Sequence, residues 1–293
     1  MTQLPFYIVD VFAETKYAGN QLAVVRGAAA LSDDEMLQIA REMNYSETTF
    51  LLSDEERDGG YDVRIFTPAE EVPFAGHPTL GTAYIIRHEL IGRPVERIVL
   101  NLKVGQIPVV FNEDPGGRLW MRQIPPRFGR TFDATAVSAA LNLKREDIDE
   151  RFPIQEVSTG LPFIICPLRT LDAVQRARTD RERFFALVED AEAKAILIFA
   201  PETYEQGNHL NARVFIDYYG LPEDPATGSA NGCLAGYLVQ HRYFGGDRLA
   251  IRVEQGYEIA RPSLLLLRAG VENGQIAINV GGRVVMVARG AFV

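Results

Sequence analysis

Cysteine is scarce in this chain, and long hydrophobic runs are absent. The only cysteines among 293 residues are Cys166 and Cys233, with neither a Cys-x-x-Cys pair nor the spacing of zinc ligands. A disulfide framework and a zinc site are therefore not indicated, and we expect free thiols inside the cell. No apolar run approaches the roughly 18 residues that a membrane-spanning helix needs. Residues 1–5 carry no basic leader or apolar signal core, so we expect a cytoplasmic protein without a membrane partner.

Positive charge is also in short supply. The chain has 30 Lys and Arg against 39 Asp and Glu, which gives a formal net charge of −9. Nucleic-acid binding needs clustered basic side chains, and the densest basic stretch, residues 176–183, is interrupted by Asp180 and Glu182. Neither a Walker motif nor a Gly-x-Gly-x-x-Gly motif occurs. We therefore expect no nucleic-acid partner, and nucleotide binding lacks its usual sequence support.

What the chain has in abundance is apolar residues, at 47%, in patterns typical of an α+β protein. Ser32 and Glu35 form a predicted capping box at the start of the first helix. The pattern predicts antiparallel sheets wrapped around one or two helices, twice over, rather than a parallel βαβ alternation. The expected strands are residues 6–12, 21–25, 48–52, 61–66, 98–104, 107–111, 119–123, 154–157, 163–167, 195–200, 209–215, 248–254, 263–269, 275–280 and 282–288, and the expected helices are residues 32–44, 78–88, 133–141, 172–179, 181–189 and 229–240.

Two stretches resemble two versions of one element. Residues 75–81 (AGHPTLG) and 224–230 (DPATGSA) each open a helix with small residues. Before each stretch the order of landmarks recurs, because Arg64-Ile65-Phe66 has its counterpart in Arg213-Val214-Phe215. The break at Pro125-Pro126-Arg127 predicts a boundary between a domain of residues 1–127 and one of residues 128–293, with the last strand as the element that can return to the first domain. A duplicated chain usually binds its ligand between the copies.

Glu47 is the first candidate for chemistry. It lies directly before an apolar strand, where a purely structural strand gains little from a carboxylate. Burial against apolar surroundings raises the pKa of a carboxyl, and such a group can remove a proton and return it elsewhere. An exposed Glu at a strand edge fits the same residues.

His77 follows Ala75 and Gly76 at a predicted helix start that suits anion binding. Imidazole titrates close to neutral pH, so this side chain can relay a proton or hydrogen-bond a substrate carbonyl. The alternative is a His that only caps or packs.

In the second copy, Asp224 precedes a helix that begins with Thr227, Gly228 and Ser229. Thr227 and Ser229 can cap the helix or donate to a ligand, while Asp224 fits either a site carboxylate or a cap that stabilises the helix dipole. Cys233 lies one turn into this apolar helix, so we expect it to pack in the core rather than act as a nucleophile.

Together these residues resemble the PhzF-like family, named for phenazine biosynthesis, within the diaminopimelate-epimerase-like superfamily. The motifs that carry the resemblance follow one another along most of the chain: VDVF at 9–12, GNQLAV at 19–24, SETTF at 46–50, FTP at 66–68, FAGHPTLG at 74–81, EDPATGSA at 223–230, QG at 255–256 and RPS at 261–263.

The resemblance implies two pseudo-symmetric domains, each a curved sheet around a central helix, with the active site in the cleft between them. It implies an isomerase that shifts a proton on a small anionic substrate, without metal, flavin, nicotinamide or pyridoxal cofactor. The catalytic residues it implies are Glu47, His77 and Asp224, and the substrate-binding residues are Asn20, Gly76, Gly228 and Ser229. A homodimer is also implied by the resemblance alone.

The chain departs from its relatives at two places. The two-cysteine epimerases of the superfamily carry one cysteine in each helix-start motif, whereas this chain has Ala75 in the first and no cysteine before the second helix. This disfavours a two-thiol racemase. The family usually has Gly where Ala260 stands, before Arg-Pro-Ser. An amino-acid epimerase and a small-ligand-binding protein without turnover stay open as alternatives.

Overall fold

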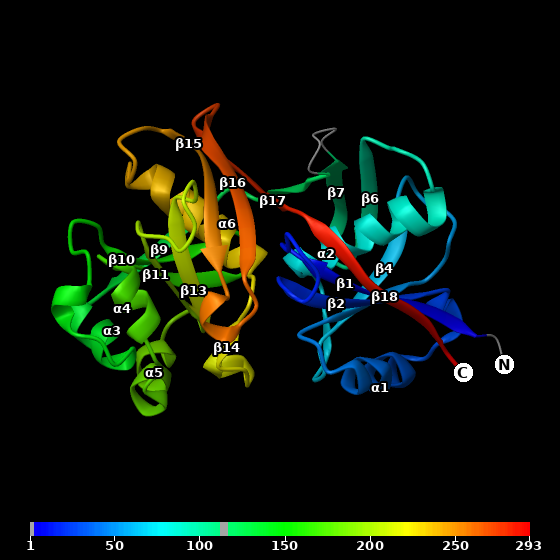
Figure 1. Ribbon diagram of the computed structural model, residues 1–293, viewed down its shortest axis with the longest axis horizontal. Helices are drawn as coiled ribbons and strands as arrows, with labels where there is room; N and C mark the ends of the chain where they lie inside the picture. Colours follow the sequence, from blue (N-terminus) through cyan, green and yellow to red (C-terminus); the bar gives the residue numbers. More distant parts are fainter. Residues whose placement is uncertain (1–2, 112–116) are drawn as a thin grey trace. The chain divides into compact units, whose positions relative to one another are not determined.

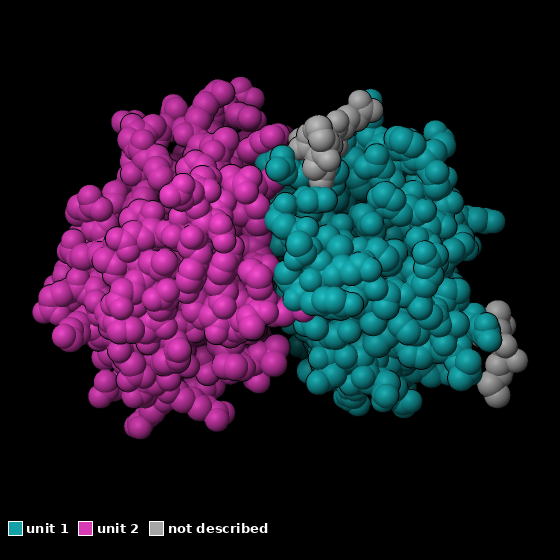
Figure 2. All heavy atoms as spheres, in the orientation of Figure 1, with its two compact units in different colours: residues 1–121, 281–293 teal, residues 122–280 magenta. Residues whose placement is uncertain are grey.

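The computed structural model describes residues 3–111 and 117–293. Residues 1–2, which belong to the segment where no leader is expected, lie outside this description. The chain forms two compact units, Met1–Met121 with Gly281–Val293 and Arg122–Val280 (Figure 2). No helix in the described ranges combines the length and the apolar character that crossing a bilayer requires.

The first unit contains one mixed sheet (Figure 1). Its strands are β1 (Leu4–Val11), β2 (Asn20–Arg26), β3 (Thr48–Leu51), β4 (Tyr61–Phe66), β5 (Glu71–Val72), β6 (Arg97–Leu102), β7 (Gly105–Phe111), β18 (Val284–Phe292) and the start of β8 (Leu119–Gln123). Strand β1 pairs antiparallel with β18 and with β2, and the series continues through β3, β4, β6 and β7 to β8. The β2–β3 and β4–β6 pairs are parallel, and the other pairs in this series are antiparallel.

Helix α2 (Gly76–Ile85) lies at the centre of this unit. It contacts β1, β2, β3, β6, β7 and β18, and nine of its ten residues are buried. A helix that is apolar on all sides needs such an enclosure. Gly81 makes the approach possible, because a Cβ atom there would lie 2.5 Å from Cδ2 of Leu22 on β2. A hydrogen bond of 2.8 Å from the Thr82 hydroxyl to that of Thr49 ties the helix to β3.

Helix α1 (Asp33–Met43) packs elsewhere on the same sheet. Its apolar side places Met36 and Ala40 against Val25, Phe50 and other buried residues. The predicted capping box is present, since the Glu35 amide donates to Ser32 Oγ and the Ser32 amide donates to Glu35 Oε2. A short 3₁₀ turn, Ala28–Ala30, precedes α1.

The second unit repeats this strand order. Its strands are β9 (Arg127–Phe132), β10 (Ile154–Ser158), β11 (Pro162–Pro167), β12 (Ile196–Ala200), β13 (Leu210–Phe215), β14 (Glu223–Asp224), β15 (Arg248–Gln255), β16 (Ser263–Glu272) and most of β17 (Gln275–Gly282). The pairs β11–β12 and β13–β15 are parallel, and they alternate with antiparallel pairs as in the first unit. The two-residue strand β14 pairs with β13 as β5 pairs with β4.

Helix α6 (Gly228–Gln240) is the counterpart of α2. It is buried along nearly its whole length and contacts β10, β11, β15 and β16. Helices α3 (Ala134–Ala140), α4 (Leu171–Arg176) and α5 (Arg181–Val188) form a separate core with one face of the sheet, in which Phe184 and Val174 are fully buried.

The predicted fold class is confirmed: each unit is an α+β structure in which a curved, mostly antiparallel sheet surrounds a central helix. Two local predictions were wrong: the helix predicted over 172–179 ends at Arg176, and the helix predicted over 78–88 changes at Ile86 into a π-helical turn, Ile86–Ile91. Strand β9 (Arg127–Phe132) begins at the last residue of the predicted break and was not predicted. Strand β9 pairs only with β10 among the named pairs and is largely exposed, so its sequence lacks a buried-strand pattern.

Candidate active site

The candidate residues of the first unit gather at one edge of its sheet. Asn20 opens β2 and is buried, and Glu47 directly precedes β3, the parallel neighbour of β2. Parallel strands begin at the same edge of a sheet. His77, the second residue of α2 after Gly76, makes a hydrogen bond to the backbone of Gln21 at this edge. The fold thus brings Asn20, Glu47 and the Gly76-His77 pair, three positions that are distant in sequence, to one edge of the sheet.

Glu47 and His77 face each other directly. Oε2 of Glu47 lies 3.4 Å from Nε2 of His77, and the two side chains are 18% and 6% exposed. This distance exceeds that of a good hydrogen bond, which is about 2.7–3.2 Å. A small movement of either side chain closes the gap, so the pair is within reach of proton transfer.

His77 is neutral at pH 7. Burial lowers its pKa from 6.5 to about 3, and the hydrogen bond to the Gln21 backbone opposes this shift only in part. The contact with Glu47 is therefore not an ion pair between opposite charges. A hydrogen bond that raises the pKa of His is one in which the ring donates. Nε2 makes no hydrogen bond in the described part of the chain, which assigns this donation to Nδ1 and leaves Nε2 as the acceptor that faces Glu47.

Both central helices begin without a side-chain cap. The N-cap of α2 is Ala75, which has no polar group, and the N-cap of α6 is Thr227, whose side chain accepts no hydrogen bond from the first turn. The first amide groups of a helix have no intrahelical partner and carry partial positive charge. The start of an uncapped helix suits an anion.

In the second unit, Asp224 on β14 stands beside the start of α6. The Thr227 hydroxyl donates to Oδ2 of Asp224 at 2.5 Å. Asp224 is buried, with 7% exposure, and Ser229 is half-buried. The carbonyl of Gly228 accepts a hydrogen bond of 3.0 Å from the side chain of Gln123.

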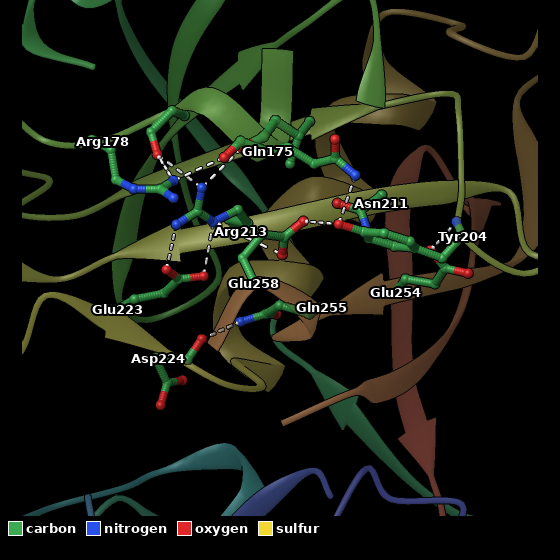
Figure 3. A network of polar contacts seen from close by, with 12 residues as sticks. Gln175, Arg178, Tyr204, Asn211, Arg213, Glu223, Asp224, Glu254, Gln255 and Glu258 are labelled. Carbon is green, nitrogen blue, oxygen red and sulfur yellow. Dashed lines mark hydrogen bonds and ion pairs between the residues drawn. The ribbon is translucent and has the colours of Figure 1, made fainter. Parts of the chain in front are cut away.

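Sequence reasoning missed one polar residue at this helix start. The side chain of Gln255, the last residue of β15, contacts the main chain of Asp224 (Figure 3). It also contacts Thr227. It appeared in the sequence only as the first residue of the Gln-Gly motif. No local pattern assigns it to Asp224, since 31 positions separate the two.

The two cysteines are poor nucleophiles. Cys166 and Cys233 are both buried, as predicted for Cys233. Burial raises the pKa of the Cys233 thiol to about 12, while its contact with Thr159 acts weakly in the other direction. Burial raises the pKa of Cys166 as well. Both groups are protonated at neutral pH, and only the thiolate is an effective base or nucleophile.

In the described part of the chain, neither a metal centre nor the hollow found in the first unit coincides with the candidate residues. Over residues 3–111 and 117–293, no cluster of three or more His, Cys, Asp or Glu side chains is arranged to hold a metal ion. A hollow of about 270 Å³ in the first unit is lined by Glu56, Arg93 and Arg97 among others. It contains none of the candidate residues, so it belongs to a different surface from the Glu47–His77 pair.

Comparison with known proteins places the chain in a family. The model of the phenazine biosynthesis-like protein family matches residues 9–290. Trans-2,3-dihydro-3-hydroxyanthranilate isomerase of Pseudomonas aeruginosa is 34% identical, over 97% of this chain and 98% of that protein. An uncharacterized isomerase of Clostridium acetobutylicum is 30% identical, over 98% and 97% of the two chains.

Solved structures agree with this placement. A PhzF-family phenazine biosynthesis protein of Bacillus anthracis superposes over 100% of both chains with a TM-score of 0.92 at 28% identity. A probable proline racemase of Agrobacterium radiobacter shares the fold, with a TM-score of 0.62 at 10% identity, over 99% of this chain and 93% of that one. The chain belongs to the phenazine biosynthesis-like, or PhzF, family of isomerases.

Proposed function

We propose that this isomerase moves a proton between two carbon atoms of a small carboxylate-bearing substrate, without a cofactor and with Glu47 as its acid/base group. The observation that carries the proposal is the contact of 3.4 Å between Glu47 and the neutral, buried imidazole of His77. A carboxyl that must gain and lose a proton in turn is better served by a neutral neighbour than by a fixed positive charge, which would hold it ionised.

The proposed reaction conserves all atoms. The Glu47 carboxylate takes a proton from one carbon as the C–H bond breaks, and the electron pair of that bond shifts the adjacent double bond. The same carboxyl then returns the proton to the carbon at the far end of the shifted system. His77, with Nε2 as an acceptor, can bind the Glu47 carboxyl group while it carries the proton between the two steps.

We assign the remaining candidates to substrate binding and charge stabilisation. The uncapped amides that begin at Gly76 and Gly228 suit the carboxylate of the substrate or the negative charge that develops on it. Asn20 and Ser229 supply polar contacts, and Asp224 a second carboxylate, which suits an ammonium or hydroxyl group of the substrate.

The substrate named for the Pseudomonas relatives, trans-2,3-dihydro-3-hydroxyanthranilate, is the first compound to test. We expect wild-type enzyme to convert it in D₂O with deuterium appearing at carbon in the product, as measured by proton NMR. Glu47→Gln removes the titrating group at nearly constant shape and should abolish turnover. Full turnover by this variant would refute the role of Glu47.

The same experiment separates the alternative reactions. One solved relative of Pseudomonas aeruginosa, with a TM-score of 0.82 at 33% identity, is titled a predicted epimerase. An epimerase would exchange the α-proton of an amino acid and invert its configuration, which chiral chromatography detects. The protonated state of both buried thiols argues against the two-thiol form of that chemistry. Binding without any exchange would indicate a ligand-binding protein.

A further inference from the structure

Gln255 is buried completely, and all the hydrogen-bonding capacity of its amide is used. Nε2 donates to the main-chain carbonyl of Asp224 at 2.8 Å and to the Thr227 hydroxyl at 3.1 Å. Oε1 accepts from the Thr227 amide at 3.2 Å and from Nδ2 of Asn231 at 2.9 Å. A glutamine has two donors and two acceptor positions, so this side chain is saturated.

These bonds span the whole connection from β14 to α6. One end of the Gln255 amide holds the Asp224 carbonyl and the other holds the amide of Thr227, the N-cap residue of α6. Pro225, which lies between them, has no N–H to support the turn. The carboxylate of Asp224 points away from Gln255 (Figure 3).

The same bonds give the Thr227 hydroxyl a direction. Because Gln255 Nε2 donates into Thr227 Oγ1, the hydroxyl proton is turned toward its own acceptor, Oδ2 of Asp224. A chain of donors therefore runs from Gln255 through Thr227 to the carboxylate. Gln255 also occupies an acceptor position of the Thr227 hydroxyl oxygen, which accepts no hydrogen bond from the first turn of α6.

The segment around Gln255 is held firmly against the same connection. Gly256 has φ +78°, and a Cβ atom there would lie 2.5 Å from the carbonyl oxygen of Pro225. The Ser263 hydroxyl donates to that oxygen at 3.0 Å. On the preceding residue of β14, the buried Glu223 pairs with Arg213 through two hydrogen bonds. Gln255 thus acts from a rigid support.

We propose that Gln255 is a positioning residue, which sets the place of the Asp224 carboxylate and keeps the start of α6 open for a substrate anion. This inference rests on the proposed function, because it assumes that Asp224 and the α6 start serve the reaction. Gln255 itself does not touch the substrate. It acts through Asp224 and Thr227.

The first test compares Gln255→Leu with Gln155→Leu. Gln155 is a matched control, because it bonds the Gly129 carbonyl and the ring of His241 at the opposite end of the same helix. With trans-2,3-dihydro-3-hydroxyanthranilate as substrate, we expect kcat/KM to fall about 10- to 100-fold for Gln255→Leu, the effect of a small displacement of a catalytic group. The kcat/KM of Gln155→Leu should stay within about threefold of the wild-type value, a change of less than about 1.4 kcal/mol in the activation free energy. Equal effects of the two variants would overturn the proposal.

A conservative variant separates positioning from general loss of stability. A protonated glutamic acid at position 255 can still donate to the Asp224 carbonyl, whereas the ionised form cannot. Burial raises the pKa of such a carboxyl. The activity of Gln255→Glu relative to wild type should therefore recover as the pH falls, while that of Gln255→Leu stays flat. A flat ratio for Gln255→Glu would contradict the proposed donor role.

A double-mutant cycle tests whether Gln255 acts through Asp224. In an Asp224→Asn background, Gln255→Leu should lower kcat/KM much less than it does in wild type, because the carboxylate that Gln255 positions is already replaced. Additive losses would overturn the inference.

Hydrogen exchange gives a readout that needs no turnover. Amides 227–231 at the start of α6 should exchange faster in Gln255→Leu than in wild type and in Gln155→Leu. If wild type turns over no substrate, the proposed function fails while this measurement still decides the positioning role. Unchanged exchange would refute that role.

Discussion

The buried, neutral His77 makes the stability of the first unit depend on pH in a specific way. In the unfolded chain this imidazole takes up a proton below its ordinary pKa of 6.5, whereas in the folded chain it does so only near pH 3. Between these values the unfolded state binds more protons, so acid favours unfolding. The stability due to a neutral His77 is therefore complete above pH 6.5 and is lost as the pH falls toward 3.

The expected magnitude follows from the two pKa values. From pH 7 to pH 5, His77 alone should lower the free energy of unfolding by about 2 kcal/mol. Because pH 5 lies well above the folded-state value of about 3, this difference depends almost wholly on the ordinary pKa of 6.5.

His77→Gln removes the titrating ring and keeps a polar side chain. Urea denaturation at pH 7 and pH 5 gives the free energy of unfolding of each protein at both pH values. The decrease from pH 7 to pH 5 should be about 2 kcal/mol larger for wild type than for the variant. The chain has a single tryptophan, Trp120, which belongs to the first unit, so its fluorescence reports on the unit that contains His77. Between pH 7.5 and 9 the two proteins should change in parallel, since His77 does not titrate there. Equal losses at pH 5 would show that His77 is protonated in the folded protein and would refute the reasoning.

Three further predictions concern stability and reactivity. Ala260 has φ +57°, a conformation that favours glycine. Ala260→Gly should therefore raise the free energy of unfolding in urea denaturation by about 0.5–1 kcal/mol, which is the relief of backbone strain less the entropy cost of glycine. A lower free energy of unfolding would mean that this turn carries no strain. Arg213→Met leaves the buried Glu223 side chain without its ion-pair partner at 2.6 Å and should lower the free energy of unfolding by about 3–5 kcal/mol. The double variant Arg213→Met with Glu223→Leu should recover most of this loss of stability. No recovery would contradict burial of an unpaired charge as the cause. Cys166 and Cys233 should react with a thiol reagent at pH 8 only after unfolding, as measured by absorbance, and rapid reaction of the native protein would show that one of them is accessible.

Much of the fold could be predicted from local patterns. The capping box at Ser32, the apolar spacing of α1 and the small residues that begin α2 and α6 are short-range signals, and each of these helices is present. Strand β9 could not be predicted, because residues 127–132 have no alternating apolar pattern and acquire their strand conformation from β10. Pairing across such a distance is not encoded locally.

In the candidate site, too, single residues could be predicted from local sequence, whereas their contacts could not. The sequence singled out Glu47 and His77 separately, but the 3.4 Å contact between them depends on the parallel pairing of β2 with β3 and on where α2 begins. The low pKa of His77 arises from burial, which composition alone does not reveal. Gln255 escaped prediction because its role is defined by main-chain groups of residues that are far away in the chain.

The equivalent starts of α2 and α6 show how a duplicated fold can acquire new chemistry. The second position of each helix follows a glycine, and it carries His77 in one copy and Ser229 in the other. The two units share the same arrangement of sheet and helix around this position, while the side chain that it carries differs between them. One ancestral unit could in this way give rise to two halves with different reactive groups.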